Sequence, residues 1–183
     1  MLRNVKDLHG FTIRATDGEI GTVDQFYFDD ETWAIRYVTV ETGAWINSRS
    51  VLISPISIVH MDWKAKRLDV ALTKKHVETS PDIDTNKPVS RQHEATYLGY
   101  YGYASYWGGP YLWGAGPYPS ALAIRTTRPA EPAADRIGRE SMDSHLRSTR
   151  GVTGYHVEAA DGEIGHVEAF VMDDEAWAIR YIE

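Results

Sequence analysis

Two histidines and two glutamates toward the C-terminal end have residue types and spacing suited to binding a metal ion. His156 and Glu158 lie two residues apart, and His166 and Glu168 repeat that spacing. Residues two apart in a strand point to the same face, and imidazole together with carboxylate oxygen suits several divalent metals. A solvated strand surface explains the same pattern, so the four residues are candidates only and we predict no metal.

Two acidic triplets offer a second kind of candidate metal site. Asp29, Asp30 and Glu31 form the first, and residues 173–175 repeat it. Carboxylate oxygens are ligands for hard cations, but Asp is also common in turns. No complete set of ligands can be assembled around either triplet. We therefore interpret both triplets as turns and predict no bound cofactor.

No motif in the sequence predicts catalysis. The chain has no cysteine, and it lacks a nucleophile elbow and a paired serine and histidine motif. Gly18 and Gly21, like Gly162 and Gly165, have the spacing G-x-x-G. Turn and bulge geometry explains this spacing better than phosphate binding does. We predict no catalytic residue and a protein that is not an enzyme.

An internal repeat supplies the elements that must position these residues. Residues 2–39 align without a gap on residues 146–183, at a constant offset of 144, and 19 of 38 positions are identical. Both copies contain D-G-E-I-G-x-V followed by D-D-E-x-W-A-I-R-Y. The candidate metal ligands match residues such as Thr12 and Arg14 in the first copy. The shared plan therefore does not require a metal.

Each copy carries an arginine within its W-A-I-R-Y motif, Arg36 or Arg180. An arginine inside a strand core usually pairs with a nearby carboxylate. Asp17 or Glu19 is the expected partner of Arg36, and their equivalents, such as Asp161, are the expected partners of Arg180. The alternative role is a recognition contact with another protein.

The first copy and the residues that follow it have the patterns of short β-strands. Residues 10–23 contain two extended runs around Asp17-Gly18, a dipeptide typical of tight hairpin turns. Residues 25–43 likewise contain two extended runs around a polar turn. Three further short extended runs precede a short helix that begins at Lys74. About six strands in so small a unit predict an all-β fold, a six-stranded antiparallel barrel that is closed or nearly closed.

These motifs resemble the PRC-barrel family, which is named for the cytoplasmic domain of the photosynthetic reaction centre H subunit. The resemblance covers residues 2–80 well and residues 146–183 as a partial copy. It implies a barrel used as a docking and assembly module in the cytosol; in the H subunit this barrel influences electron and proton transfer to quinone. The chain lacks the transmembrane helix of that subunit, since no run approaches the ~20 apolar residues that a span needs. Photosynthesis therefore follows from the family name alone.

The sequence divides into a barrel at residues 1–80, a linker at 81–145 and a partial second unit at 146–183. Within the linker, Tyr97–Ser120 contains seven tyrosines, two tryptophans, six glycines and no charge. Glycine and proline disfavour regular elements, so we expect a largely irregular linker. The alternatives are an aromatic ligand for a partner's surface or for the barrel, and stacking on carbohydrate or bases.

Charge and targeting signals limit the class of partner. The net charge of −7 disfavours binding to nucleic acid. The N-terminal residues have no apolar core segment and no cleavage site typical of a signal peptide. We therefore expect a cytoplasmic protein whose partners are other proteins.

The second copy is incomplete in this sequence. Glu183 matches Thr39, so the equivalents of residues 40–72 are missing. A half barrel buries too little surface to stand alone and exposes a strand edge. We favour a natural protein with two whole barrels; the alternative is completion on the first barrel, the aromatic linker or another chain. We expect the 183-residue chain to self-associate, or its second unit to be poorly protected from hydrogen exchange.

Two functional hypotheses follow. The preferred one is a non-enzymatic interaction and assembly module that scaffolds a cytoplasmic or membrane-associated complex. The alternative is a barrel that binds a small ligand or a metal and aids sensing or electron transfer.

Overall fold

The structure is a computed structural model that describes residues 1–46, 49–81, 89, 91–107, 109–123 and 145–183. The proline- and alanine-rich part of the linker, residues 124–144, lies outside the described residues. The first unit contains β1 (Leu2–Asn4), η1 (Val5–Leu8), β2 (Thr12–Ala15), β3 (Gly18–Asp29), β4 (Ile35–Glu41), η2 (Gly43–Ile46), β5 (Ser50–Ile53), η3 (Pro55–Ser57), β6 (Ile58–Asp62), β7 (Arg67–Val70) and α1 (Lys74–Glu78).

Helix α2 (Arg91–Tyr101) and the 3-10 turn η4 (Pro119–Leu122) follow the first unit. The second copy contains β8 (Leu146–Ser148), α3 (Thr149–Val152), β9 (His156–Ala159), β10 (Gly162–His166), β11 (Phe170–Asp173) and β12 (Ala178–Ile182). The elements of the two copies therefore follow one another in matching order, from β1 to β4 and from β8 to β12.

The sheet of the first unit is mixed. Its strand order is β5-β4-β3-β2-β7-β6, and β8 adds to β3. Strands β2 and β7 pair in parallel, so the expectation of a purely antiparallel barrel is wrong. The 3-10 turn η3 lies between β5 and β6, which do not form a hairpin. Strand β7 therefore runs in the same direction as β2 where the two pair. Among the described strands no pairing joins β5 to β6, and closure of the barrel is not seen.

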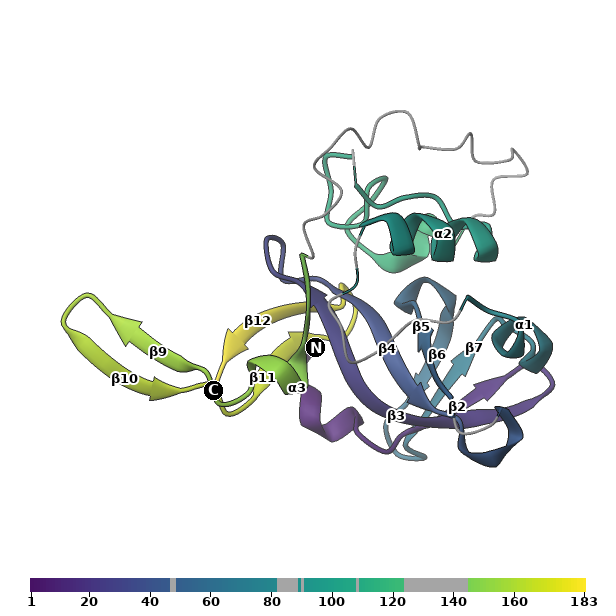
Figure 1. Ribbon diagram of the computed structural model, residues 1–183, viewed down its shortest axis with the longest axis horizontal. Coiled ribbons are helices and arrows are strands. Elements are labelled where there is room, and N and C mark those ends of the chain that lie inside the picture. The colour runs from purple at the N-terminus through teal and green to yellow at the C-terminus, as the bar shows by residue number, and fades with distance from the viewer. Residues whose placement is uncertain (47–48, 82–88, 90, 108, 124–144) are drawn as a thin grey trace.

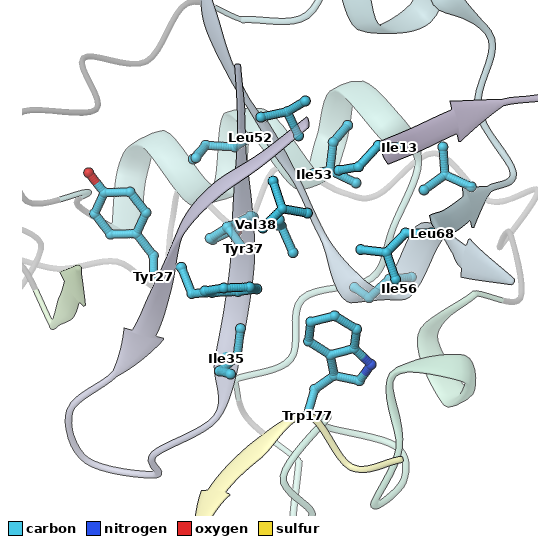
Figure 2. Packing of buried hydrophobic residues seen from close by; sticks show 14 of the residues in the cluster. Ile13, Tyr27, Ile35, Tyr37, Val38, Leu52, Ile53, Ile56, Leu68 and Trp177 are labelled. Atoms are coloured by element: carbon cyan, nitrogen blue, oxygen red, sulfur yellow. The ribbon is translucent and has the colours of Figure 1, made fainter. Parts of the chain in front are cut away.

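A continuous apolar core fills the space that this sheet encloses. Ile13, Ile53 and Leu68 are completely buried, and they come from three different strands (Figure 2). A bulge in the β2–β3 hairpin leaves Ile20 as the extra residue between the paired positions, and the Ile20 side chain is 1% exposed. This core holds the first unit together through burial of apolar surface.

The aromatic segment after the first unit is ordered and packed on the sheet. Helix α2 lies across it (Figure 1). The hydroxyl of Tyr97 donates to the Leu52 carbonyl oxygen at 2.9 Å and accepts from the Ser54 N–H at 3.2 Å. The indole of Trp113, also fully buried, donates to the Ala176 carbonyl oxygen at 2.8 Å. Apart from the end of α2 and the turn η4, the described part of this segment forms no helix or strand, but its hydroxyl and indole groups satisfy buried backbone atoms and allow the rings to pack.

The two copies exchange their first strands. Strand β1 pairs with β11 of the second copy, and β8 pairs with β3 of the first. The registers are reciprocal at the offset of 144: Leu2 lies opposite Asp173, and Leu146 lies opposite Asp29. Each copy thus supplies a strand to the sheet of the other.

The same reciprocity continues at the tryptophans of the W-A-I-R-Y motifs. Trp33 and Trp177 both have positive φ angles, 60° and 53°. The N–H of Ile35 donates to the Trp177 carbonyl oxygen at 2.7 Å, and the N–H of Ile179 donates to the Trp33 carbonyl oxygen at 2.8 Å. Equivalent residues make equivalent bonds, so an approximate two-fold axis relates the two copies.

Candidate interaction surface

Half of the second copy is docked on the first unit, and the other half protrudes from it. Strands β11 and β12 lie in one sheet with β1, whereas β9 and β10 form a separate two-stranded hairpin that extends away from the body (Figure 1). Met172 on β11 and Trp177 before β12 are buried, and Trp177 belongs to the same cluster as Ile35 and Tyr37 (Figure 2).

Apolar positions that form the core in the first unit are exposed in the second. The equivalent pairs, with their exposed fractions, are Phe11 and Tyr155 (1% and 62%), Ile20 and Ile164 (1% and 70%), Tyr37 and Tyr181 (1% and 60%), and Val38 and Ile182 (0% and 44%). We call the four exposed residues of the second copy, Tyr155, Ile164, Tyr181 and Ile182, the open face. Large apolar side chains that are exposed to water are candidates for sites of association.

Strand pairing and the packing of α2 explain the difference between the copies, since Tyr97 and Glu94 of α2 cover Tyr37. In the first unit, β7 covers the outer edge of β2 and β5 covers the outer edge of β4. In the second copy, β10 is the only described strand that pairs with β9. The open face therefore corresponds to core positions without the elements that cover them in the first unit.

The second copy is also strongly acidic. Residues 155–183 contain eight Asp and Glu residues and one basic residue, Arg180, apart from histidine. On the hairpin, Glu158 lies opposite Glu163, whereas the corresponding pair in the first unit is Arg14 opposite Glu19. Like charges directly opposite each other destabilise a strand pair. The hairpin thus lacks a cation that its counterpart has.

The candidate metal ligands do not form a cluster. His156 lies opposite His166 across the hairpin, but the Nδ1 atom of His156 contacts Glu163 Oε1 at 2.5 Å. Glu168 instead lies 3.9 Å from the Lys6 ammonium. No group of three or more metal-binding side chains occurs within the part of the chain that the structure describes.

The glycines of the D-G-E-I-G motif serve backbone geometry. Gly18 and Gly162 have φ angles of 143° and 140° at the hairpin turns, a region that favours glycine. At Gly21 a Cβ atom would lie 2.1 Å from the Glu41 carbonyl oxygen, whereas at Gly165 it would meet nothing within 4 Å. The close approach at Gly21 thus has no counterpart in the open second copy.

Arg36 pairs with a carboxylate, but not with the one expected from the sequence. Its guanidinium lies 3.3 Å from Asp29 Oδ2 and donates to the Leu112 carbonyl oxygen at 2.8 Å. Asp17 accepts instead from the Lys74 N–H at 2.8 Å, at the start of α1. The choice of Asp17 or Glu19 as the partner is wrong, because both side chains are exposed at the β2–β3 turn, whereas Asp29 is buried beside Arg36.

Arg180 likewise pairs with an aspartate of the acidic turn rather than with Asp161. Its guanidinium lies 3.7 Å from Asp173 Oδ2, and its side chain is half exposed. Arg36 is buried and stacks over the Tyr106 ring at 3.7 Å. The aromatic segment therefore covers the arginine of the first copy only.

Asp29 is held in its charged form by this environment. Burial alone would raise the pKa of Asp29, but N–H groups of Thr32 and Glu31 donate to its carboxylate at 3.1 Å, and Arg36 adds a positive charge. The net effect lowers the pKa of Asp29 below its ordinary value. Asp29 of this acidic turn therefore binds Arg36 and two backbone N–H groups of its own turn.

A buried polar cluster, not identified from the sequence, fixes the aromatic segment to the sheet. Glu94 on α2 is fully buried and accepts from the hydroxyls of Tyr37, at 3.1 Å, and Tyr106, at 2.6 Å. The Nε2 atom of His145 lies 2.9 Å from Glu94 Oε2. Burial raises the pKa of Tyr37 well above its ordinary value, and the Glu94 charge adds to the shift. Tyr37 therefore remains a proton donor to Glu94.

A pocket of about 380 Å³ lies between the two copies. Its twelve lining residues consist of six equivalent pairs at the offset of 144, so the approximate two-fold axis passes through it. Val5, Phe26 and Phe170 give it a buried apolar lining, and the charged side chains of Lys6 and Arg150 lie around it. Its volume falls within the range of small-molecule sites.

Comparison with known proteins agrees with the geometry of the first unit. A family model described as "PRC-barrel domain" matches residues 2–81. The chain contains a PRC-barrel domain. The second copy lies outside the matched range. No curated protein matches the chain, and no helix among the described residues is both long and apolar enough to cross a membrane.

Proposed function

We propose that this PRC-barrel protein is a non-enzymatic assembly module of the cytoplasm, in which the barrel is a rigid base and the second copy presents its open face to a protein partner. The observation that carries the proposal is the exposure of the open face at positions whose counterparts in the barrel are core. Four large apolar side chains of the second copy are exposed to water, and association would remove them from it.

Site-specific photo-cross-linking tests this proposal. A photoreactive amino acid would replace either Ile164 on the open face or Val59 on the barrel, two apolar residues with similar exposure, 70% and 68%. In cells we expect a defined protein adduct at position 164 and none at position 59. The identified partner, once purified, should bind wild type and Val59→Asp equally and should not bind Ile164→Asp. Equal labelling at both positions would refute the proposal.

A second candidate function is the binding of a small ligand, and the pocket between the copies favours it. Two ion pairs, each between one copy and the other, lie beside its apolar lining: Lys6 with Glu168 at 3.9 Å, and Arg150 with Asp24 at 2.5 Å. A small amphiphile with apolar and charged parts would suit such a lining. Calorimetric titration with quinone analogues would test it, and a saturable signal lost in Phe170→Trp would support it. Absence of heat at any ligand concentration would exclude this class of ligand.

A further inference from the structure

We propose that the pocket between the two copies binds a flat, mostly apolar ring through an amide group at one edge of that ring, and that the side chain of Gln25 recognises this edge. The inference rests on the second candidate function, ligand binding in this pocket, and names the chemical class of the buried part of the ligand. It does not depend on the open face.

The two ends of the pocket differ in polarity, although the repeat relates one end to the other. Thr149 Oγ1 accepts from the Phe26 N–H at 3.3 Å, so Thr149 lies close to Gln25, the neighbour of Phe26 in the chain. At the other end, the counterparts of Gln25 and Thr149 are the apolar residues Ala169 and Val5. One end is therefore polar and the other apolar, and this difference orients a ligand that has a single polar edge.

The polar end offers hydrogen-bonding groups that the described part of the chain does not use. Gln25 is 9% exposed and lines the pocket, and its side-chain amide forms no hydrogen bond with any residue that the structure describes. Thr149 is 8% exposed. Its oxygen accepts from Phe26, and its hydroxyl proton has no acceptor among the described residues. Buried polar groups without partners cost free energy, so both side chains favour a ligand that pairs with them.

The amide of Gln25 selects a ligand edge that has both a donor and an acceptor. Its NH₂ group donates hydrogen bonds and its carbonyl oxygen accepts them. An N–H next to a C=O, as in a cyclic amide, pairs with both groups at once. A quinone has acceptors only and would leave the Gln25 carbonyl oxygen without a donor. The hydroxyl of Thr149 supplies a further donor for the carbonyl oxygen of the ligand.

The rest of the lining suits a flat apolar ring. Phe26 and Phe170 are equivalent residues of the two copies, each is 2% exposed, and both line the pocket. Aromatic side chains pack favourably against other rings in offset or edge-to-face contacts. Val5 and Ala169 make the far end apolar, so a hydrocarbon edge fits there while the amide edge faces Gln25.

The rim of the pocket carries the charges. The side chains of Lys6 and Arg150 are 58% and 62% exposed, so a charged part of a ligand would lie at the rim and leave the ring in the buried part. Half of the lining, including Gln25 and Phe26 on β3, comes from the first unit. The described lining includes no residue of β9 or β10, and the pocket is therefore independent of the protruding hairpin.

Two ring compounds and two variants of the full chain provide the test. Carbostyril is a cyclic amide fused to a benzene ring, and quinoline has the same two rings without the amide. Titration followed by amide NMR of the labelled chain should show that wild type binds carbostyril about tenfold more tightly than quinoline. Carbostyril should also shift the side-chain NH₂ signal of Gln25. Gln25→Met should abolish the preference without weakening quinoline binding, and the control Val5→Thr, at the apolar end, should keep it.

Each contrary result has a definite meaning. Equal affinities of wild type for the two compounds, or a preference that Gln25→Met keeps, would overturn the role of Gln25. Loss of the preference in Val5→Thr would overturn the proposed orientation. If Gln25→Met binds neither compound, the Gln25 NH₂ signal of wild type decides, and the absence of a shift with carbostyril overturns the inference.

The inference and the second candidate function fail separately. If carbostyril does not bind, but a quinone analogue binds and its signal is lost in Phe170→Trp, the inference falls and the pocket remains a ligand site. If neither carbostyril nor any quinone analogue binds, both fall together. The proposed assembly function is tested at Ile164 and is unaffected by either result.

Discussion

Replacement of equivalent isoleucines by alanine should have very different effects in the two copies. Ile20 and Ile164 occupy the same position of the repeat, and each is the extra residue of a hairpin bulge. Ile20 is 1% exposed and Ile164 is 70% exposed. Removal of a buried isoleucine side chain lowers the free energy of unfolding by about 2–5 kcal/mol. Ile164→Ala removes little buried surface, and we expect a loss below ~1 kcal/mol, mainly from strand propensity.

Urea denaturation followed by tryptophan fluorescence measures this difference, at two protein concentrations. Met172→Ala is the control, because Met172 belongs to the second copy but is fully buried. It should cost about 2–5 kcal/mol, like Ile20→Ala. If Ile164→Ala costs as much as Ile20→Ala at both concentrations, the open face is covered within one chain and the reasoning is refuted. A cost that appears only at high concentration would indicate a second copy on that face.

Three further predictions concern the first unit and the aromatic segment. Glu94→Gln should lower the free energy of unfolding by about 1–3 kcal/mol, because it disturbs a buried carboxylate bonded to two tyrosines; the exposed Glu78→Gln is the control, and equal effects would contradict the role of the cluster. The lowered pKa of Asp29 stabilises the fold above about pH 3.9, the ordinary value, and this contribution is lost as pH falls through the folded-state pKa. The stability difference between wild type and Asp29→Asn should therefore shrink in acid titrations below about pH 4, and a constant difference would argue against it. Thermal unfolding should show Gly21→Ala destabilised by its clash with Glu41, and Gly99→Ala, in α2 with open space around it, stabilised by about 0.5–1 kcal/mol; the reverse order would conflict with both placements.

Local patterns of the sequence predicted much of the first unit. The dipeptide Asp17-Gly18 marks the turn between β2 and β3, and α1 begins at Lys74 as expected. These features depend on a few neighbouring residues with strong conformational preferences. The match of residues 2–81 to the PRC-barrel model confirms the family resemblance of the first copy.

Features that depend on distant parts of the chain could not be predicted in the same way. Strands β1 and β8 are three residues long, too short to show a period, and their exchange depends on the other copy. Glu94 and His145 meet although they lie far apart in the sequence, near opposite ends of the linker. The aromatic segment has no regular period either, and its order depends on buried hydroxyl and indole groups that find backbone partners.

Hydrogen exchange on the monomeric chain tests the central claim most directly, namely that the second copy is half docked and half open. The docked strands β11 and β12 should exchange slowly, because they belong to one sheet with β1. The hairpin of β9 and β10 should exchange quickly, because an isolated two-stranded hairpin is marginally stable. The account predicts that residues 156–166 lose protection from exchange far ahead of residues 12–22, their equivalents in the first unit. Protection of residues 156–166 equal to that of residues 12–22 in a monomer without any partner would contradict it.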